Sequence, residues 1–178
     1  MQKSLRPAAF LDRDGVINVD HGYVHSIDKL DWVNGAIPAI RRLRESNYLI
    51  IVVTNQSGVA RGYYSEKMLN QFHTQMNGIL RAEKASIDRF YYCPYHPEAN
   101  IDHYKHPNHR DRKPNPGMLL RAMEELPIDR ERSFLIGDKQ SDVHAAANAG
   151  VRGHLFDGSD LDLLVKKILR ALSLIPST

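Results

Sequence analysis

The sequence contains little cysteine and no long hydrophobic run. Its 178 residues include one cysteine, Cys93, which excludes an intramolecular disulfide and is typical of a reducing compartment. No apolar stretch approaches the roughly 20 residues that cross a bilayer, and the first residues do not have the pattern of a signal peptide. These features predict a cytoplasmic protein that has no membrane partner.

Charge of one sign is not concentrated anywhere in the chain. The sequence has 24 Lys and Arg against 21 Asp and Glu, a net charge of +3, without a basic run. This mild excess suits an anionic small molecule and gives little support for nucleic acid as a partner. The length and the 42% hydrophobic content predict one domain over residues 1–178, and we expect a monomer.

Short apolar runs alternate with helical patterns along the whole chain. The run at 48–53 is continuous and β-branched, which is typical of a parallel strand covered on both faces. Further strands are predicted near 8–11, 87–92, 133–136 and 151–156, with helices between them. The order predicts an α/β fold: a three-layer, doubly wound, Rossmann-like parallel sheet.

Two of the predicted helices carry more detailed expectations. Ser65 is a candidate N-cap for a long helix, and Asn115 is a candidate N-cap with Pro116 at the first helical position. The long helix is expected to direct six apolar side chains inward, namely Met68, Leu69, Phe72, Met76, Ile79 and Leu80.

Two carboxylates follow the first strand. Asp12 and Asp14 are separated by Arg13, so an extended backbone would direct both acids to one side, and Gly15 allows a sharp turn. Neighbouring carboxylates favour a hard cation such as Mg²⁺. Taken alone, the tetrapeptide is equally compatible with a simple Asp-Gly turn.

Polar groups also follow the other strands, where ligands bind in folds of this kind. Thr54 ends the second strand, Asp138 ends the fourth, and Lys113 precedes a helix. Each has a simple alternative: a strand cap, a turn or a solvated charge. Together they provide carboxylates for a cation, a hydroxyl and an ammonium group for phosphate oxygens, and a carboxylate that could attack phosphorus.

Four motifs resemble those of the haloacid dehalogenase (HAD)-type phosphohydrolases: DRDGV at 12–16, TNQSG at 54–58, RKPNPGM at 112–118 and GDKQSD at 137–142. Three further blocks, at 18–24, 52–62 and 91–98, resemble the D-glycero-D-manno-heptose-1,7-bisphosphate 7-phosphatases, a group related to histidinol phosphatase. About forty residues separate Asp14 from Thr54, which leaves no room for a large cap domain. The site is therefore expected to be open and shaped by loops.

The resemblance implies a role for each matched residue. Asp12 would be the nucleophile, Asp14 the acid and base, and Thr54 and Lys113 would hold phosphate oxygens. Mg²⁺ would be held by Asp12, the backbone carbonyl of Asp14, and Asp138. Lys139 and Asp142 would support the site. The implied substrate contacts, for a sugar phosphate, are Asp20, His21, Gly22, Tyr23, Asn55, Gln56, Ser57, Arg112 and Lys139.

The loop at 93–115 departs from the family pattern, in which a zinc site of the form C-x-H and C-x-C precedes RKP. Cys93 is kept, but Tyr95, His109 and Asp111 occupy the other three positions. Cys93, His96, His109 and Asp111 are candidate ligands for a structural Zn²⁺. Since this set is poor compared with three thiolates, we expect a metal-free loop braced by its prolines, a minor insertion and not a domain.

The resemblance therefore implies a Mg²⁺-dependent phosphatase that removes the 7-phosphate of a heptose bisphosphate. Such a reaction would be a step in the biosynthesis of nucleotide-activated heptose, which supplies the synthesis of lipopolysaccharide. Histidinol-phosphate phosphatase or another small sugar-phosphate phosphatase is the alternative within enzymes. A phosphatase of nucleic-acid ends would need a basic groove, and a catalytically dead binding module would not need all five catalytic residue types.

Overall fold

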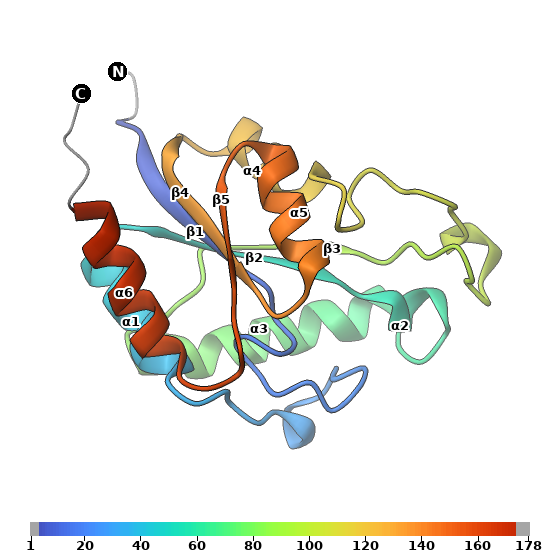
Figure 1. The fold of residues 1–178 in the computed structure, drawn as a ribbon. Helices are drawn as coiled ribbons and strands as arrows, with labels where there is room; N and C mark the ends of the chain where they lie inside the picture. Colours follow the sequence, from blue (N-terminus) through green and yellow to red (C-terminus); the bar gives the residue numbers. More distant parts are fainter. Residues whose placement is uncertain (1–3, 174–178) are drawn as a thin grey trace.

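The computed structural model describes residues 4–173, so residues 1–3 and 174–178 of the expected 1–178 domain lie outside it. Five parallel strands form one sheet in the order β3-β2-β1-β4-β5 (Figure 1). The strands are β1 (Arg6–Leu11), β2 (Leu49–Asn55), β3 (Arg89–Cys93), β4 (Ile128–Gly137) and β5 (Arg152–Leu155). The helices are α1 (Ala36–Glu45), α2 (Ser57–Ala60), α3 (Glu66–Ala82), α4 (Gly117–Glu125), α5 (Gln140–Ala149) and α6 (Leu161–Ser173), with short 3-10 turns at Ile27–Lys29 and Asp102–Tyr104.

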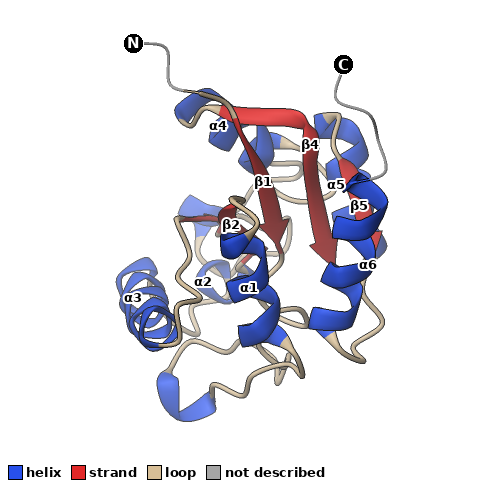
Figure 2. Ribbon diagram, turned by 90° about the vertical axis from the view of Figure 1, so that its left-hand side faces the viewer, coloured by secondary structure: helices blue, strands red, loops and turns tan. Residues whose placement is uncertain are grey.

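Helices cover both faces of the sheet, which confirms the three-layer α/β prediction. One hydrophobic cluster joins α1, α3 and α6 to the sheet, and a second joins α4 and α5 to the opposite face. Figure 2 shows α1 and α6 side by side on the first of these faces. Strand β1 lies in the centre, and its residues 7–11 are buried. No helix within residues 4–173 is long and apolar enough to cross a membrane.

The long helix α3 begins as expected but buries fewer side chains. The Ser65 Oγ accepts a hydrogen bond from the Met68 backbone N–H at 3.2 Å, which is an N-cap. The prediction that Met68 and Ile79 point inward is wrong, because they are 44% and 39% exposed. Each lies about 100° around the helix from a buried neighbour, and α3 covers the sheet along a narrower stripe than its apolar sequence suggests.

The start of α4 also differs from expectation, because Pro116 is the N-cap and the helix begins at Gly117. Asn115 does not cap it, since its side-chain amide donates to the Asn108 Oδ1 and the His109 carbonyl. The side chain therefore stabilises the preceding loop.

The strand order determines where a site can form. The chain runs from β1 outward through β2 and β3, and then crosses back to place β4 and β5 on the other side of β1. This reversal between β1 and β4 opens a crevice at the carboxyl ends of the strands, where doubly wound proteins bind ligands. The residues that follow β1, β2 and β4 consequently meet at one edge.

Candidate active site

A buried ion-pair cluster forms the floor of the site. The Lys113 Nζ lies 3.1 Å from the Asp12 Oδ1, pairs with the Asp142 carboxylate and donates to the Val53 carbonyl at 2.9 Å. Asp12, Lys113 and Asp142 are 7%, 4% and 1% exposed. A single ammonium group is thus shared by two carboxylates from opposite sides of the crevice, which holds Asp12 in a fixed orientation.

Burial and charge act on the Asp12 carboxyl in opposite directions. The pKa of Asp12 is raised to about 6, chiefly by burial and also by the neighbouring carboxylates Asp142 and Asp14, whereas the Lys113 ammonium lowers it. For Lys113, burial favours the neutral amine, but the two carboxylates outweigh burial and raise the pKa. At neutral pH the cluster therefore holds a charged ammonium group beside a largely ionised Asp12, which is the form that can attack phosphorus.

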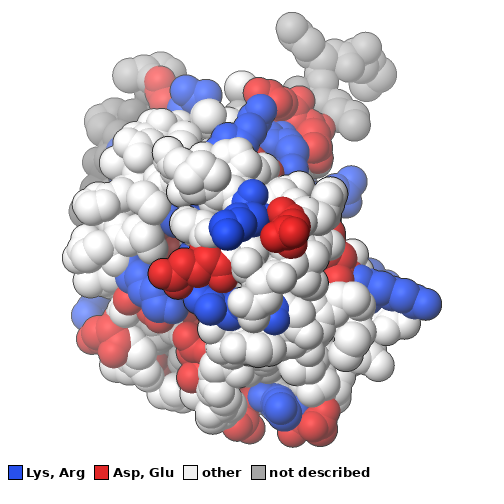
Figure 3. Space-filling model, turned by 90° about the vertical axis from the view of Figure 1, so that its right-hand side faces the viewer, with Lys and Arg blue, Asp and Glu red and all other residues white. Residues whose placement is uncertain are grey.

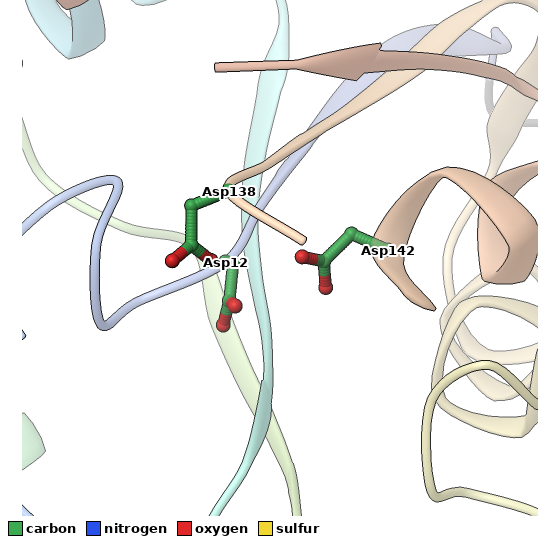
Figure 4. A group of neighbouring side chains, drawn as sticks. All are labelled: Asp12, Asp138 and Asp142. Carbon is green, nitrogen blue, oxygen red and sulfur yellow. The ribbon is translucent and has the colours of Figure 1, made fainter. Parts of the chain in front are cut away.

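Asp138 completes a group of carboxylates that fits a divalent cation. Ligand oxygens of Asp12, Asp138 and Asp142 lie within 4.8 Å of one another. Figure 4 shows Asp138 and Asp142 directed toward Asp12 from different sides. The Asp138 Oδ1 is buried and has no hydrogen-bond partner within residues 4–173, and burial raises the pKa of this carboxyl. A hard cation would satisfy this oxygen and offset the repulsion, so the residues fit Mg²⁺.

The residue at position 15, beside the carboxylate group, must be a glycine. Its φ is +84°, and a Cβ at this position would lie 2.4 Å from the Asp138 Oδ2. Only glycine leaves room for the Asp138 carboxylate at the turn that follows β1.

Asp14 directly precedes Gly15 in this turn. Strand β1 ends at Leu11, so Asp12 and Asp14 do not alternate along a strand as the sequence suggested, although both line one cavity. The Asp14 carboxylate accepts hydrogen bonds from Arg13, Asn18 and Gln56. Its orientation is therefore determined by side chains and not by the strand.

The motif that follows β2 orients two of these groups. The Asn55 amide donates to the Lys113 carbonyl and accepts from the Lys113 N–H, both at 3.1 Å, which fixes the loop that carries Lys113. The Gln56 Nε2 donates to the Thr54 Oγ1 at 2.9 Å. Asn55 and Gln56 thus position other site residues, in addition to facing the cavity where substrate contacts were predicted.

A cavity of about 670 Å³ lies above this floor. It brings together most of the predicted site residues: Asp12, Asp14, Asp20, Gly22, Tyr23, Thr54, Asn55, Gln56, Ser57, Arg112, Lys113 and Lys139. His21 is not among the lining residues, because its Nε2 pairs with the Asp31 Oδ2 at 2.6 Å at the surface. At the rim the Lys139 Nζ lies 3.6 Å from the Asp20 Oδ2. Its positive charge is therefore available there for a second anionic group of a ligand.

Sequence reasoning missed three residues that line the cavity, Tyr64, Pro114 and Ser141, and it gave no role to the buried Arg13. Tyr64 lies two residues beyond the block at 52–62, whereas Arg13 lies within the DRDGV motif. A larger open groove of about 1050 Å³ lies between α3 and residues 25–28, but it contains none of the predicted catalytic groups.

The loop at 93–115 is held by stacking and by an ion pair. The rings of Tyr95 and His109 stack with centroids 4.0 Å apart, and the Asp111 Oδ2 accepts from the Arg121 Nη1 at 2.9 Å. The Cys93 Sγ lies 3.8 Å from the His109 Nδ1, and burial raises the pKa of the thiol to about 11. His96 is used locally, since its Nδ1 accepts from the Glu98 N–H. The Asp111 Oδ2 and the His96 Nδ1 are thus bonded to protein groups, whereas the Asp111 Oδ1 is buried without a hydrogen-bond partner among residues 4–173. The metal-free loop stays a prediction.

The face that carries this loop contains both signs of charge. In Figure 3 the Lys and Arg side chains are interspersed with Asp and Glu and do not form one continuous basic patch on this face. The distribution suits a small anionic ligand better than a nucleic-acid backbone.

Known proteins with similar sequences are phosphatases, in agreement with this geometry. A family model described as HAD-hydrolase-like matches residues 111–159. The D-glycero-β-D-manno-heptose-1,7-bisphosphate 7-phosphatase of Rhodopseudomonas palustris is 46% identical over 92% of this chain and 91% of its own. The enzyme of the same name from Escherichia coli K12 is 45% identical over 85% of this chain and 78% of its own.

Solved structures show the same architecture. A HAD-like phosphatase from Mesorhizobium loti has a TM-score of 0.85 and 32% identity, and the match covers 99% of this chain and 90% of that one. The D,D-heptose 1,7-bisphosphate phosphatase of B. bronchiseptica, in complex with magnesium and phosphate, has a TM-score of 0.78 and 29% identity, with 93% and 99% covered.

The fold, the carboxylate group and the buried lysine define a HAD-like phosphatase, a phosphoric monoester hydrolase, and residues 4–173 include no large cap domain. The chain belongs to the D-glycero-β-D-manno-heptose-1,7-bisphosphate 7-phosphatase family.

Proposed function

We propose that this protein hydrolyses the C7 phosphate of D-glycero-D-manno-heptose 1,7-bisphosphate through a phosphorylated Asp12. The observation that carries the proposal is the buried Asp12 at the floor of the cavity, held by Lys113 and close to Asp138, in a chain 46% identical to a phosphatase of that name. A single domain over residues 1–178 carries the whole site.

In the first step the Asp12 carboxylate attacks phosphorus, and the bond from phosphorus to the sugar oxygen breaks. Lys113 and the Thr54 hydroxyl, 4% and 1% exposed, are suited to hold the phosphate oxygens as charge builds on them. Asp14 lines the same cavity and donates its proton to the departing sugar oxygen.

In the second step a water molecule attacks phosphorus and releases Asp12. Asp14, ionised by the first step, accepts the proton of this water. The hydrogen bonds that the Asp14 carboxylate accepts from Arg13, Asn18 and Gln56 hold its orientation in the cavity for both steps.

Asp12 and Asp138, with the carbonyl of Asp14, are the proposed ligands of Mg²⁺. The cation, when bound, neutralises charge between the phosphate and the attacking carboxylate. Asp142 is close enough to contribute, but its pairing with Lys113 and its bond from the Lys139 N–H favour a supporting role.

The rim suits the rest of the substrate. Arg112 and Lys139 offer positive charge for the second phosphate, while Asp20, Gly22, Tyr23 and Ser57 face the cavity where the sugar would lie. His21 does not line the cavity. Its proposed effect on substrate binding would be indirect, through the position of the 18–24 segment, which it ties to Asp31.

As part of this proposal, the protein acts in the cytoplasm and supplies nucleotide-activated heptose for lipopolysaccharide. The site is complete within one chain, which supports a monomer.

A phosphate-release screen tests the substrate. The purified protein is assayed with Mg²⁺ against the α and β anomers of the heptose bisphosphate, histidinol phosphate and simple hexose phosphates. The proposal predicts the highest kcat/KM for a heptose bisphosphate and no release by Asp12→Asn. A higher kcat/KM for histidinol phosphate would overturn the substrate assignment but not the chemistry.

A further inference from the structure

Arg13 is the largest fully buried side chain among residues 4–173, although it lies between two acids at the edge of an open cavity. Its guanidinium packs over the Phe72 ring, 5.1 Å from the centroid. Its Nη2 donates to both Asp14 oxygens at 2.8 Å and to the Val24 carbonyl at 2.6 Å, and its Nε lies 3.2 Å from the Asp14 Oδ1. A buried guanidinium is costly unless its donors are paired, and Asp14 provides the matching charge.

His73 on α3 pairs the remaining edge of this guanidinium. The Arg13 Nη1 lies 3.0 Å from the His73 Nε2, and the His73 ring stacks on Phe90 with centroids 4.5 Å apart. Since an arginine can only donate, the Nε2 accepts and the ring proton is on Nδ1. Burial and the charge of Arg13 hold the pKa of His73 well below its usual range, which is consistent with an accepting ring.

Two further donors hold the same carboxylate from other directions. The Asn18 Nδ2 donates to the Asp14 Oδ1 and the Gln56 Nε2 to the Asp14 Oδ2, each at 2.9 Å. The orientation of Gln56 is fixed in turn by the Tyr64 hydroxyl, which donates to its Oε1 at 2.6 Å. Asp14 is thus held by groups from the turn after β1, the segment after β2 and, through Arg13, helix α3.

We propose that Arg13, anchored by His73 from helix α3, is a positioning residue that places the Asp14 carboxylate at the leaving-group oxygen. The inference rests on the acid role proposed above for Asp14, and it adds a buried pair, Arg13 and His73, that does not line the cavity. Arg13 fixes the position of Asp14 on one side, and His73 keeps Arg13 from turning toward another acceptor.

Two substrates whose leaving groups differ in basicity distinguish the positioning of Asp14 from a general effect on the fold. A sugar hydroxyl is a poor leaving group and needs the proton of Asp14, whereas 4-nitrophenolate leaves without one. The kcat/KM reports the steps through departure of the leaving group. A misplaced Asp14 therefore lowers kcat/KM for the heptose bisphosphate and not for 4-nitrophenyl phosphate, while a damaged fold lowers both.

Two substitutions at His73 separate the effect of its hydrogen bond with Arg13 from the effect of its ring packing on Phe90. His73→Phe keeps an aromatic ring against Phe90 but offers Arg13 no acceptor, whereas His73→Gln offers a carbonyl oxygen without the ring. Met76→Ala, at a buried position about one turn further along α3, is the control for lost packing. Arg13→Lys, which keeps the charge but cannot bond both Asp14 oxygens and His73 at once, gives the same comparison if His73→Phe does not fold.

We expect His73→Phe and Arg13→Lys to lower kcat/KM for the sugar bisphosphate about tenfold or more, with the aryl phosphate changed by less than about twofold. We expect His73→Gln to restore most of the difference and Met76→Ala to affect both substrates equally. Equal losses on both substrates in His73→Phe and Arg13→Lys, or no loss on either, would overturn the inference. The parallel variant Asp14→Asn tests the proposed function: if it shows no preference between the substrates, the acid role fails, and the inference fails with it.

Discussion

Replacing Lys113 with methionine removes the cation between Asp12 and Asp142 while keeping a side chain of similar length. The Lys113 Nζ lies 3.1 Å from the Asp12 Oδ1, and both side chains are less than a tenth exposed. Two unit charges at this distance attract by about 5 kcal/mol at an effective dielectric constant of about 20. If water entry and rearrangement cancel half of this, about 2.5 kcal/mol of preference for the ionised Asp12 is lost.

That energy corresponds to a roughly 70-fold rise in the proton affinity of Asp12. The pKa of Asp12 is about 6 with Lys113 in place, so roughly nine-tenths of the carboxyl is ionised at pH 7. In Lys113→Met roughly one-eighth would be ionised, a sevenfold loss of nucleophile that is recovered as the pH rises. The lost contact to phosphate oxygens adds a loss that does not depend on pH, on the order of 10²-fold.

The assay is kcat/KM for the heptose bisphosphate from about pH 5 to about pH 9.5 at constant Mg²⁺. Bound Mg²⁺ lowers the pKa of Asp12 in the parent and in the variant alike. The pH profiles of the two proteins are therefore compared with each other at the same Mg²⁺ concentration. We expect the acid limb of Lys113→Met to lie at higher pH than that of the parent. Lys139→Met is the matched control, because the side chain of Lys139 is 60% exposed at the rim, and we expect it to move the acid limb less than Lys113→Met does. An unmoved acid limb in Lys113→Met would show that Lys113 does not lower the pKa of Asp12.

Three further predictions use residues described above. Gly15→Ala would displace Asp138 and raise the Mg²⁺ concentration for half-activation about tenfold or more, whereas Gly22→Ala, with φ +78° and nothing within 4 Å among the described residues, would not. Arg112→Ala would raise KM for the bisphosphate and leave KM for a monophosphate unchanged; equal changes would contradict its role at the second phosphate. Because His73 is protonated more easily in the unfolded chain, the free energy of unfolding falls as the pH drops below about 6.5, by up to about 1.4 kcal/mol per pH unit from this group. His73→Phe should flatten that slope in chemical denaturation.

The strands and their ends could be predicted from sequence because their signals are local. A continuous β-branched run at 48–53 followed by a polar residue, Thr54, can be recognised without knowledge of the rest of the chain. The parallel order then brings the strand ends to one edge, so Asp12, Thr54 and Asp138 could be grouped before the structure was known.

The environment of Arg13 could not be predicted in this way. An arginine between two acids suggests a solvated charge, yet its burial depends on Val24 in the following segment and on Phe72 and His73 on α3. These contacts form only in the folded chain. The exposure of Met68 and Ile79 has a similar origin, because the helical period shows which positions are apolar and not how far the sheet extends beneath them.

The 93–115 loop gave the weakest prediction for a related reason. Its stacking of Tyr95 on His109 and the pairing of Asp111 with Arg121 join residues 10 or more positions apart, without a periodic pattern that would indicate them. The sequence could show which positions of the family's zinc pattern carry other residues, but not which contacts those residues make.

The covalent step on Asp12 can be tested by trapping the phosphorylated enzyme. The protein is mixed with heptose bisphosphate labelled with ³²P at C7 and quenched in acid within the first turnover, and the labelled peptide is mapped by mass spectrometry. The account predicts label on Asp12 and none in Asp12→Asn. Label on another residue, or an Asp12→Asn protein that releases phosphate as fast as the parent, would contradict it.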